Sequence, residues 1–328
     1  MLPNSFIEVF KLVRDSIVLP FNYGYDFYRY IRYSSTFSKL NNKNKVRALL
    51  IKDFHVIEKG LSLSKPRPGF GQVVVKRVIR YTALYIENYG VDSVVISSLN
   101  ALIEYQRFNK KNDLCIQWLD VFLNNVSHVL ASNQSETGGT INISRSEILE
   151  KSSGCFEDLA NTRHSIRVFD VTPVSSEILK KAAIIARKTP SVCNRQTSHI
   201  FIFEDNKIKE DILSLQGGNR GFGDMASHIV AITSDLNCFS GANERNQAYV
   251  DGGLMAMTFV YALHSLGVGT CFLNWSVTSG VDRSLKKVAN IPSSHVVISL
   301  LAVGNIPPDL KVACSARIDI NEMLHFVK

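Results

Sequence analysis

Two short polar stretches in the second half of the chain hold the residues best suited to binding a charged ligand. The first, RHSIRVFD at residues 163–170, has two arginines four positions apart with a histidine and a serine between them. Arginine makes planar, charge-assisted hydrogen bonds to phosphate oxygens, and serine adds a hydroxyl donor. The predicted phosphate-binding residues are Arg163, His164, Ser165 and Arg167. Arginine pairs at helix ends are also common in structural roles, so this stretch decides nothing by itself.

The second stretch, TPSVCNRQ at residues 189–196, separates two apolar patterns with a run of polar residues. Asparagine and glutamine side chains carry both donors and acceptors, which suits the edge of a heteroaromatic ring. A plain connection between a helix and a strand is the simpler interpretation, because such connections are short and polar as well. The candidate binding residues here are Pro190, Ser191, Asn194 and Gln196.

A third stretch, GGNRGFGD at residues 217–224, is rich in glycine, which lets the backbone approach a ligand closely. It lacks the G-x-G-x-x-G spacing of a dinucleotide site and does not follow a strand, so that fingerprint fails. Asn219 is its best-placed polar side chain. A short strand-like run that ends at Trp275 follows the long apolar helix, and Arg317 could bind a phosphate from the far end of the chain.

The elements that must position these residues change character along the chain. Apolar residues recur at helical spacing between residues 46 and 61, 73 and 89, and 93 and 107, so residues 1–131 are predicted to be largely helical and basic. Residues 132–152 are rich in Ser, Asn and Gly, which predicts a linker. Residues 153–328 are predicted to form a second domain.

Helices and strands alternate in that second domain. The predicted strands are HIFIFED, SHIVAITSD and HVVISLLAVGN. The first has apolar residues on both faces, and all three are expected to be buried. The predicted helices begin near Phe156, Ser175 and Gly252, the last being apolar nearly all round and so suited to a core or a subunit interface. This order predicts an α+β domain with a central sheet and covering helices.

Composition narrows the function classes. The chain has 328 residues, 45% hydrophobic and 20% charged, which is ordinary for a globular protein. The longest apolar run, residues 252–263, is too short to span a bilayer. The six cysteines form no C-x-x-C pair, so no metal site is predicted, and reduced thiols favour the cytoplasm.

The charge is unevenly distributed. Residues 1–155 carry 20 Lys and Arg against 13 Asp and Glu, a balance of +7 within a total of +8. Such a surface can attract nucleic acid, anionic lipid or anionic metabolites, or it can simply be a solvated face. No groove-reading motif is present, so a nucleic-acid partner is not expected.

Taken together, residues 156–328 resemble the nitroreductase family of flavin enzymes. In that family an R-x-S-x-R-like start precedes a helix, P-S-x-x-N-x-Q, a strand, a long interface helix ending in L-G-x-G, and a late arginine. The matching positions are Arg163, Ser165, Arg167, Pro190, Ser191, Asn194, Gln196, Leu266, Gly267, Gly269 and Arg317. The family often has Pro and Trp where Thr197 and Ser198 stand, and a second basic residue where Ser315 stands.

The resemblance implies an α+β fold with a central mixed sheet, and FMN bound at the interface of a homodimer. Arg163, His164, Ser165 and Arg167 would hold the phosphate and reach the pyrimidine edge, Asn219 would bond the isoalloxazine, and Arg317 would contact the phosphate. The loop of Pro190, Ser191, Asn194 and Gln196 would meet the flavin from the partner subunit. Backbone groups at Leu273, Asn274 and Trp275 would lie beside the flavin N5.

The expected function is ping-pong hydride transfer from NADH or NADPH through flavin N5 to a small molecule, with no acid or base residue assigned. The resemblance does not cover residues 1–150, although a similar basic helical half precedes such domains in some nitroreductase-related proteins of polysaccharide gene clusters. A dehydrogenase that passes electrons to oxygen is one alternative. The other is a binding protein with a relict flavin site, whose basic half binds a polyanion or a membrane surface.

Overall fold

The computed structural model describes residues 4–33, 43–131, 138–152, 154–192, 195–239 and 242–327. The chain divides into two compact units. Met1–Tyr28 and Ser144–Leu310 form one, called the sheet unit here, and Arg29–Ile143 and Lys311–Lys328 form the other, called the helical unit. The first helix, α1 (Asn4–Tyr33), spans that division. No helix in the described ranges is long and apolar enough to cross a membrane.

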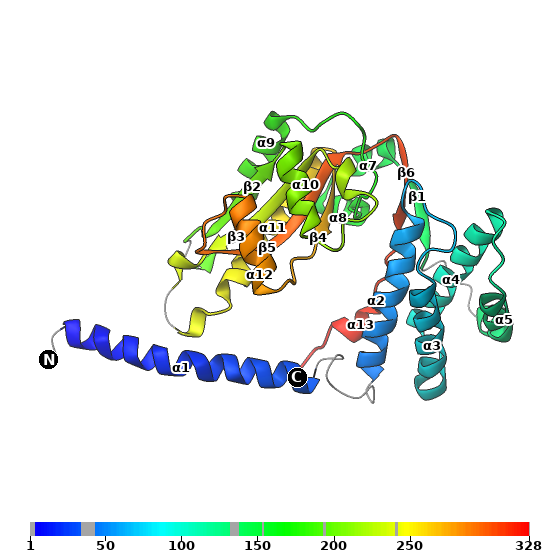
Figure 1. Cartoon of the computed structure of the whole chain (residues 1–328), viewed down its shortest axis with the longest axis horizontal. Helices are drawn as coiled ribbons and strands as arrows, with labels where there is room; N and C mark the ends of the chain where they lie inside the picture. Colours follow the sequence, from blue (N-terminus) through cyan, green and yellow to red (C-terminus); the bar gives the residue numbers. More distant parts are fainter. Residues whose placement is uncertain are drawn as a thin grey trace. The chain divides into compact units, whose positions relative to one another are not determined.

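The sheet unit is built on four strands in the order β2-β3-β5-β4 (Figure 1). These are β2 (Ser198–Phe203), β3 (His228–Asp235), β5 (His295–Asn305) and β4 (Val268–Leu273), and each neighbouring pair is antiparallel. One parallel bridge joins Ser165 to Thr270 of β4. The parallel part of the predicted mixed sheet is therefore confined to this bridge.

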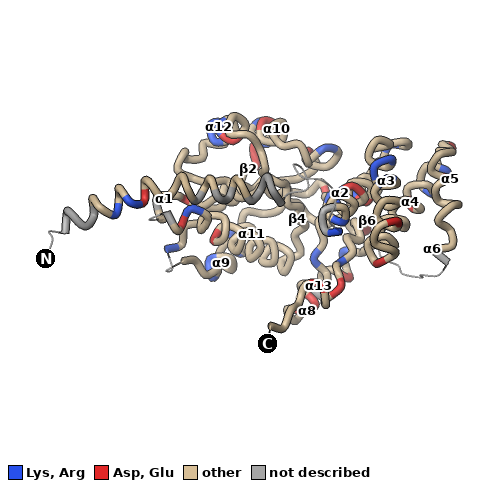
Figure 2. Tube along the Cα trace, turned by 90° about the horizontal axis from the view of Figure 1, so that it is seen from below, with Lys and Arg blue, Asp and Glu red and all other residues tan. Residues whose placement is uncertain are grey.

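Helices cover both faces of the sheet. Figures 1 and 2 show α10 (Asn206–Ser214) and α12 (Ser279–Val288) on one face, and α9 (Ser176–Ala186) and α11 (Gln247–Ser265) on the other. The short helices α7 (Arg145–Ser152) and α8 (Phe156–Thr162) precede them in the chain. Ser175 caps α9 by accepting a hydrogen bond from the Ile178 backbone, as its sequence position predicts.

The apolar pattern explains which strands are central. β3 is buried from His228 through Ser234, which confirms the prediction of a strand covered on both faces. β2 does not follow the same prediction, because it lies at an edge of the sheet and side chains such as Ile202 stay 38% exposed. Gly252 lets α11 press against β5, since a Cβ there would come within 2.3 Å of the Ile298 side chain.

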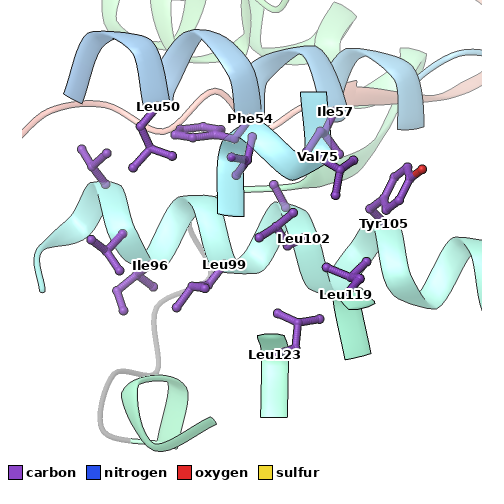
Figure 3. Close-up of a cluster of buried hydrophobic side chains, with 14 of the residues drawn as sticks. Leu50, Phe54, Ile57, Val75, Ile96, Leu99, Leu102, Tyr105, Leu119 and Leu123 are labelled. Atoms are coloured by element: carbon purple, nitrogen blue, oxygen red, sulfur yellow. The ribbon is translucent and has the colours of Figure 1, made fainter. Parts of the chain in front are cut away.

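The helical unit packs around one apolar core. Its elements are α2 (Lys43–Leu61), α3 (Gln72–Tyr89), α4 (Ser93–Lys111), α5 (Gln117–Asn125), α6 (Ser127–Ala131), β1 (Thr140–Ser144), β6 (Asp309–Ala313) and α13 (Ile320–Met323). Figure 3 shows Leu50, Leu99 and Leu102 within one cluster of buried hydrophobic side chains. The helical spacing read from the sequence is confirmed for these three helices.

Two features of this unit differ from the predicted division at residues 1–131, 132–152 and 153–328. Residues 138–152 of the predicted linker include β1 and α7, because Gly138 and Gly139 bring the backbone against α4 and the Gly139 amide donates to buried Glu58. In addition, residues 311–328 join the helical unit, because β6 pairs with β1. The predicted residues 132–137 lie outside the described ranges.

Candidate active site

The segment that carries the predicted phosphate-binding residues runs beside the edge strand β4. The Ile166 amide donates to the Thr270 carbonyl at 2.9 Å, and the Asp170 amide donates to the Asn305 carbonyl at 2.9 Å. Ile166 and Phe169 are buried and anchor the segment in the core. The same segment carries Arg163, Ser165 and Arg167.

Arg167 is the most deeply buried of the predicted phosphate-binding residues. Its side chain is 7% exposed, and its guanidinium carbon lies 6.0 Å from the centre of the Phe222 ring. One nitrogen donates to the Ser165 carbonyl at 3.4 Å, and no carboxylate of the described residues lies within ion-pair distance. A buried charge without a counter-ion is costly, so this position favours a bound anion.

The pKa of His264, at the end of α11, is affected by the positive charges of the same region. Burial and the nearby charges of Arg163 and His164 lower the pKa of His264 to about 4. The ring is 3% exposed and its Nε2 lies 3.0 Å from the Thr162 hydroxyl. The imidazole is therefore neutral at pH 7, while its surroundings attract negative charge.

A second group of predicted residues is joined through Gln216. The Gln216 side chain donates to the Asn274 carbonyl at 3.0 Å and accepts from the Gly218 amide at 2.7 Å. The Asn219 amide donates to the carbonyls of Leu213 and Gln216. The structure thus links Asn219 and Asn274 through Gln216. The side-chain amide of Asn219 already donates its hydrogen bonds to carbonyl groups of its own loop.

The other two residues of the 273–275 run face inward. Leu273 is 2% exposed, and Trp275 is 8% exposed with its indole nitrogen donating to Asp282 at 3.0 Å. Their side chains belong to the core, so these two residues leave only backbone groups for a ligand. The predicted use of backbone groups beside a ring stays a prediction.

The polar loop before β2 is held from two sides. The Val192 amide donates to the Asp251 carboxylate of α11 at 3.2 and 3.3 Å, and Arg195 forms a two-point ion pair with Glu244 at 2.8 and 3.0 Å. Ser191 Oγ accepts from the Gln196 amide at 2.8 Å. Gln196 has φ 52°, a left-handed conformation that turns the chain into β2. Asn194 lies outside the described residues.

This loop borders a cavity of about 330 Å³. The predicted residues Pro190, Ser191 and Gln196 line it together with Arg187 and the buried carboxylate of Asp251. Neither Arg187 nor Asp251 was among the predicted residues. The signal for Asp251 was its position as the single charged residue within the apolar sequence of α11. Gln216 was missed as well, and only its place before two glycines marked it.

The two groups of residues lie at opposite edges of one sheet. Arg163–Arg167 and Asn274 adjoin β4, whereas the 190–196 loop leads into β2. Four strands separate their edges by about 14 Å, given the usual spacing between neighbouring strands. Arg317 is in the helical unit, exposed, and donates to the Ser315 carbonyl at 2.7 Å, so the structure does not join it to either group.

An apolar groove of about 690 Å³ runs along α11 within the sheet unit. Phe156, Ile185, Val250, Leu254 and Tyr261 are among the side chains that line it. Phe156 is 70% exposed and Leu254 is 46% exposed. One side of the apolar helix α11 therefore packs in the core, and another side lines this groove.

Comparisons with known proteins find matches to the same part of the chain. A model described as "Nitroreductase family" matches residues 160–218 and 214–305. An NADPH-dependent oxidoreductase of Staphylococcus aureus (strain USA300) is 23% identical over 184 residues, which cover 52% of this chain and 72% of that protein. The fold and these matches define this part of the chain as an oxidoreductase domain. More specifically, residues 160–305 match the model of the nitroreductase family.

Part of this chain is also similar to solved structures of nitroreductases. A nitroreductase family protein from Streptococcus pneumoniae TIGR4 is 20% identical with a TM-score of 0.44, and the match covers 53% of this chain and all of that one. An FMN-dependent nitroreductase from Clostridium difficile R20291 is 20% identical with a TM-score of 0.43, covering 52% of this chain and 98% of that one.

Proposed function

We propose that this protein is an FMN-dependent NAD(P)H oxidoreductase that transfers hydride in two half-reactions. The match to the model of the nitroreductase family supports the reaction class. A relative is named an NADPH-dependent oxidoreductase, which supports a nicotinamide as the reductant. The free thiols among the described cysteines agree with a reducing compartment, so we place the enzyme in the cytoplasm. The observation that carries the proposal is the buried, uncompensated charge of Arg167.

The residues beside β4 suit FMN in charge and in polarity. Arg163 and Arg167 provide guanidinium groups for the phosphate or the pyrimidine carbonyls, and Ser165 provides a hydroxyl donor. Gln216 keeps Asn219 and the Asn274 carbonyl together, so that the edge of a ring meets fixed donors and acceptors. The low pKa of His264 leaves the region positive without adding a further titrating group at neutral pH.

The chemistry itself would come from the flavin, which accepts hydride at N5 and passes it on. The residues of this chain would bind and orient the cofactor and keep its surroundings positive, because a reduced flavin gains negative charge near N1. Arg167 is the residue placed to hold that charge. We assign no protein acid or base, because no step of this scheme requires one.

We further propose that the working site is shared between two copies of the chain. The two groups of predicted residues stand at opposite edges of one sheet, so a single copy does not close both around one ring. A twofold dimer through the α11 groove would generate two equivalent sites, each with one edge from each copy. Burial of the groove would also cover the large apolar side chains that α11 exposes.

The test begins with the visible absorption spectrum of the purified protein, before and after NADH or NADPH is added without oxygen. A yellow protein that bleaches on addition supports the proposal, and a protein that stays colourless after incubation with FMN contradicts it. Arg167→Gln is expected to weaken FMN binding about 10-fold or more, since a hydrogen bond to a charged group contributes about 1.5–3 kcal/mol.

The matched control is Arg283→Gln, which removes the same charge from an exposed position on α12. It is expected to leave FMN binding unchanged. Equal affinity in the Arg167 variant and the native protein would contradict the role assigned to Arg167 while leaving the reaction class open to the spectral test.

A further inference from the structure

The helical unit contains a cavity of about 490 Å³ that the oxidoreductase chemistry does not use. Its walls come from the segment that follows α2, from the last turns of α4, and from β6. Ligand sites in proteins commonly have volumes of about 300–1,000 Å³, so this cavity has the size for a small molecule. The lining residues are Leu61, Leu63, Ser64, Pro66, Glu104, Arg107, Phe108, Lys111, Asn112 and Lys311.

Three cationic side chains line this cavity from two different elements. Arg107 and Lys111 stand one helical turn apart on α4, and Lys311 comes from β6, some two hundred residues later in the chain. Two like charges at positions i and i+4 repel each other in an isolated helix. Across the residues that the structure describes, none of the three has a hydrogen bond or an ion pair with the protein.

The single carboxylate of the cavity is already committed elsewhere. Glu104 accepts a hydrogen bond from the Thr140 amide at 2.6 Å and another from the Thr140 hydroxyl. Three cations and one carboxylate leave a formal balance of +2 on the lining. The neighbouring Lys110 shows the contrast, because it forms an ion pair with Asp120 at 3.0 Å and does not line the cavity.

The remaining walls are apolar or neutral. Leu61, Leu63, Pro66 and Phe108 form the apolar part, and the Ser64 hydroxyl and Asn112 amide offer neutral hydrogen-bond donors. A phosphate monoester carries about −1.5 to −2 charges at pH 7, which balances the lining, whereas a carboxylate carries half of that. Arginine and lysine are also the usual partners of phosphate oxygens.

We propose that this cavity, called the cationic pocket here, binds the phosphate or diphosphate group of a small molecule whose remaining part is compact and apolar. The phosphate contacts Arg107, Lys111 and Lys311, and the apolar part lies against Leu63, Pro66 and Phe108. The same chemistry is present in a soluble phosphorylated metabolite and in a phospholipid headgroup. The pocket gives the basic half of the chain a specific ligand in place of a diffuse charged surface.

The experiment uses the full-length protein with FMN added and titrates it calorimetrically with inorganic pyrophosphate at low salt. Binding is expected in the native protein and is expected to weaken at least 10-fold in both Lys111→Gln and Lys311→Gln, which lie on separate elements. The control Lys52→Gln removes one charge from an exposed position of the same unit outside the pocket, and binding is expected to change less than 2-fold.

Sedimentation with vesicles that contain phosphatidic acid forms the second arm. Binding to vesicles that is lost in the two pocket variants identifies a lipid headgroup as the source, and binding to pyrophosphate alone identifies a soluble ligand. The proposal is overturned if neither probe binds, or if Lys52→Gln weakens binding as much as the pocket variants do. Circular dichroism and the flavin spectrum of each variant separate a lost pocket from a lost fold.

Discussion

The helices α2–α5 enclose most of their large apolar residues, whereas the sheet unit leaves several of them exposed along α11. Leu50, Leu99 and Leu102 of the helical unit are fully buried, and the core there is continuous across α2, α3 and α4 (Figure 3). In the sheet unit Phe156, Tyr249 and Val250 are each more than half exposed beside the α11 groove. The helical unit has a closed core of its own, and on the proposal above the sheet unit is completed by a second copy of the chain.

The two units also differ in whether a buried charged side chain has a partner of opposite charge. The buried carboxylate of Asp53 in the helical unit receives two hydrogen bonds from Arg77, each at 2.8 Å. In the sheet unit the buried guanidinium of Arg167 has no such partner among the described residues. Saturated interactions indicate a structural role, and an unsaturated charge in a closed position indicates a binding site.

The largest expected effect tests the self-sufficiency of the helical unit. Leu99→Ala leaves a cavity in its core and is expected to lower the free energy of unfolding by about 2–5 kcal/mol. Val73→Ala on α3, where the side chain is 72% exposed, is the control and is expected to have little effect. Urea unfolding followed by circular dichroism gives both values. Equal losses in the two variants would contradict the closed core.

The next largest effect is a loss of stability of the sheet unit at acidic pH. His264 has a pKa of about 4 in the folded chain against an ordinary value near 6.5, so the unfolded state binds its proton first as the pH falls. The stability of the sheet unit is therefore expected to fall between pH 6.5 and 4, by up to about 3 kcal/mol, and to keep its full value above pH 6.5.

The comparison of native protein with His264→Gln isolates this contribution. Glutamine does not titrate and can still bond the Thr162 hydroxyl, so the variant is expected to show a shallower pH dependence over that window. Urea unfolding at pH 7, 5.5 and 4 measures it for both proteins. Parallel curves would show that other groups cause the acid sensitivity.

The smallest of the three effects concerns association. Leu254→Asp places a charge in the α11 groove and is expected to raise the dimer dissociation constant about 100-fold, which corresponds to about 2.7 kcal/mol. Val171→Asp puts the same charge on a side chain that is 99% exposed in the same unit, and is expected to leave association unchanged. Sedimentation velocity distinguishes them, and a native protein that is monomeric at every concentration would contradict the shared site.

The parts of this fold that depend on local spacing could be predicted from the sequence. The apolar repeats of α2, α3 and α4 give their helices directly, and the buried strands β3 and β5 are continuous apolar runs. The edge position of β2 could not be predicted in this way, because it depends on which strand lies beside it. Its own residues, HIFIF, are as apolar as those of a central strand.

The candidate site shows the same limit. Residue types and order predicted Arg167 and the 190–196 loop, but not the groups that hold them. Asp251 and Glu244 hold the loop, although they come about fifty residues later in the chain. Gln216 bonds Asn274, which is 58 residues away in the sequence, and so links it to Asn219. Such contacts arise from the folded geometry, and no local pattern encodes them.

The pairing of β1 with β6 has a consequence for the order of synthesis. A ribosome delivers α2–α6 early, but the strand that completes the helical unit emerges only after the last strand of the sheet unit, β5. The helical unit must therefore wait, with β1 unpaired, while more than 150 residues are added. Lys311 arrives with that late strand, so a nascent chain lacks the third cation of its pocket until the sheet unit has been translated.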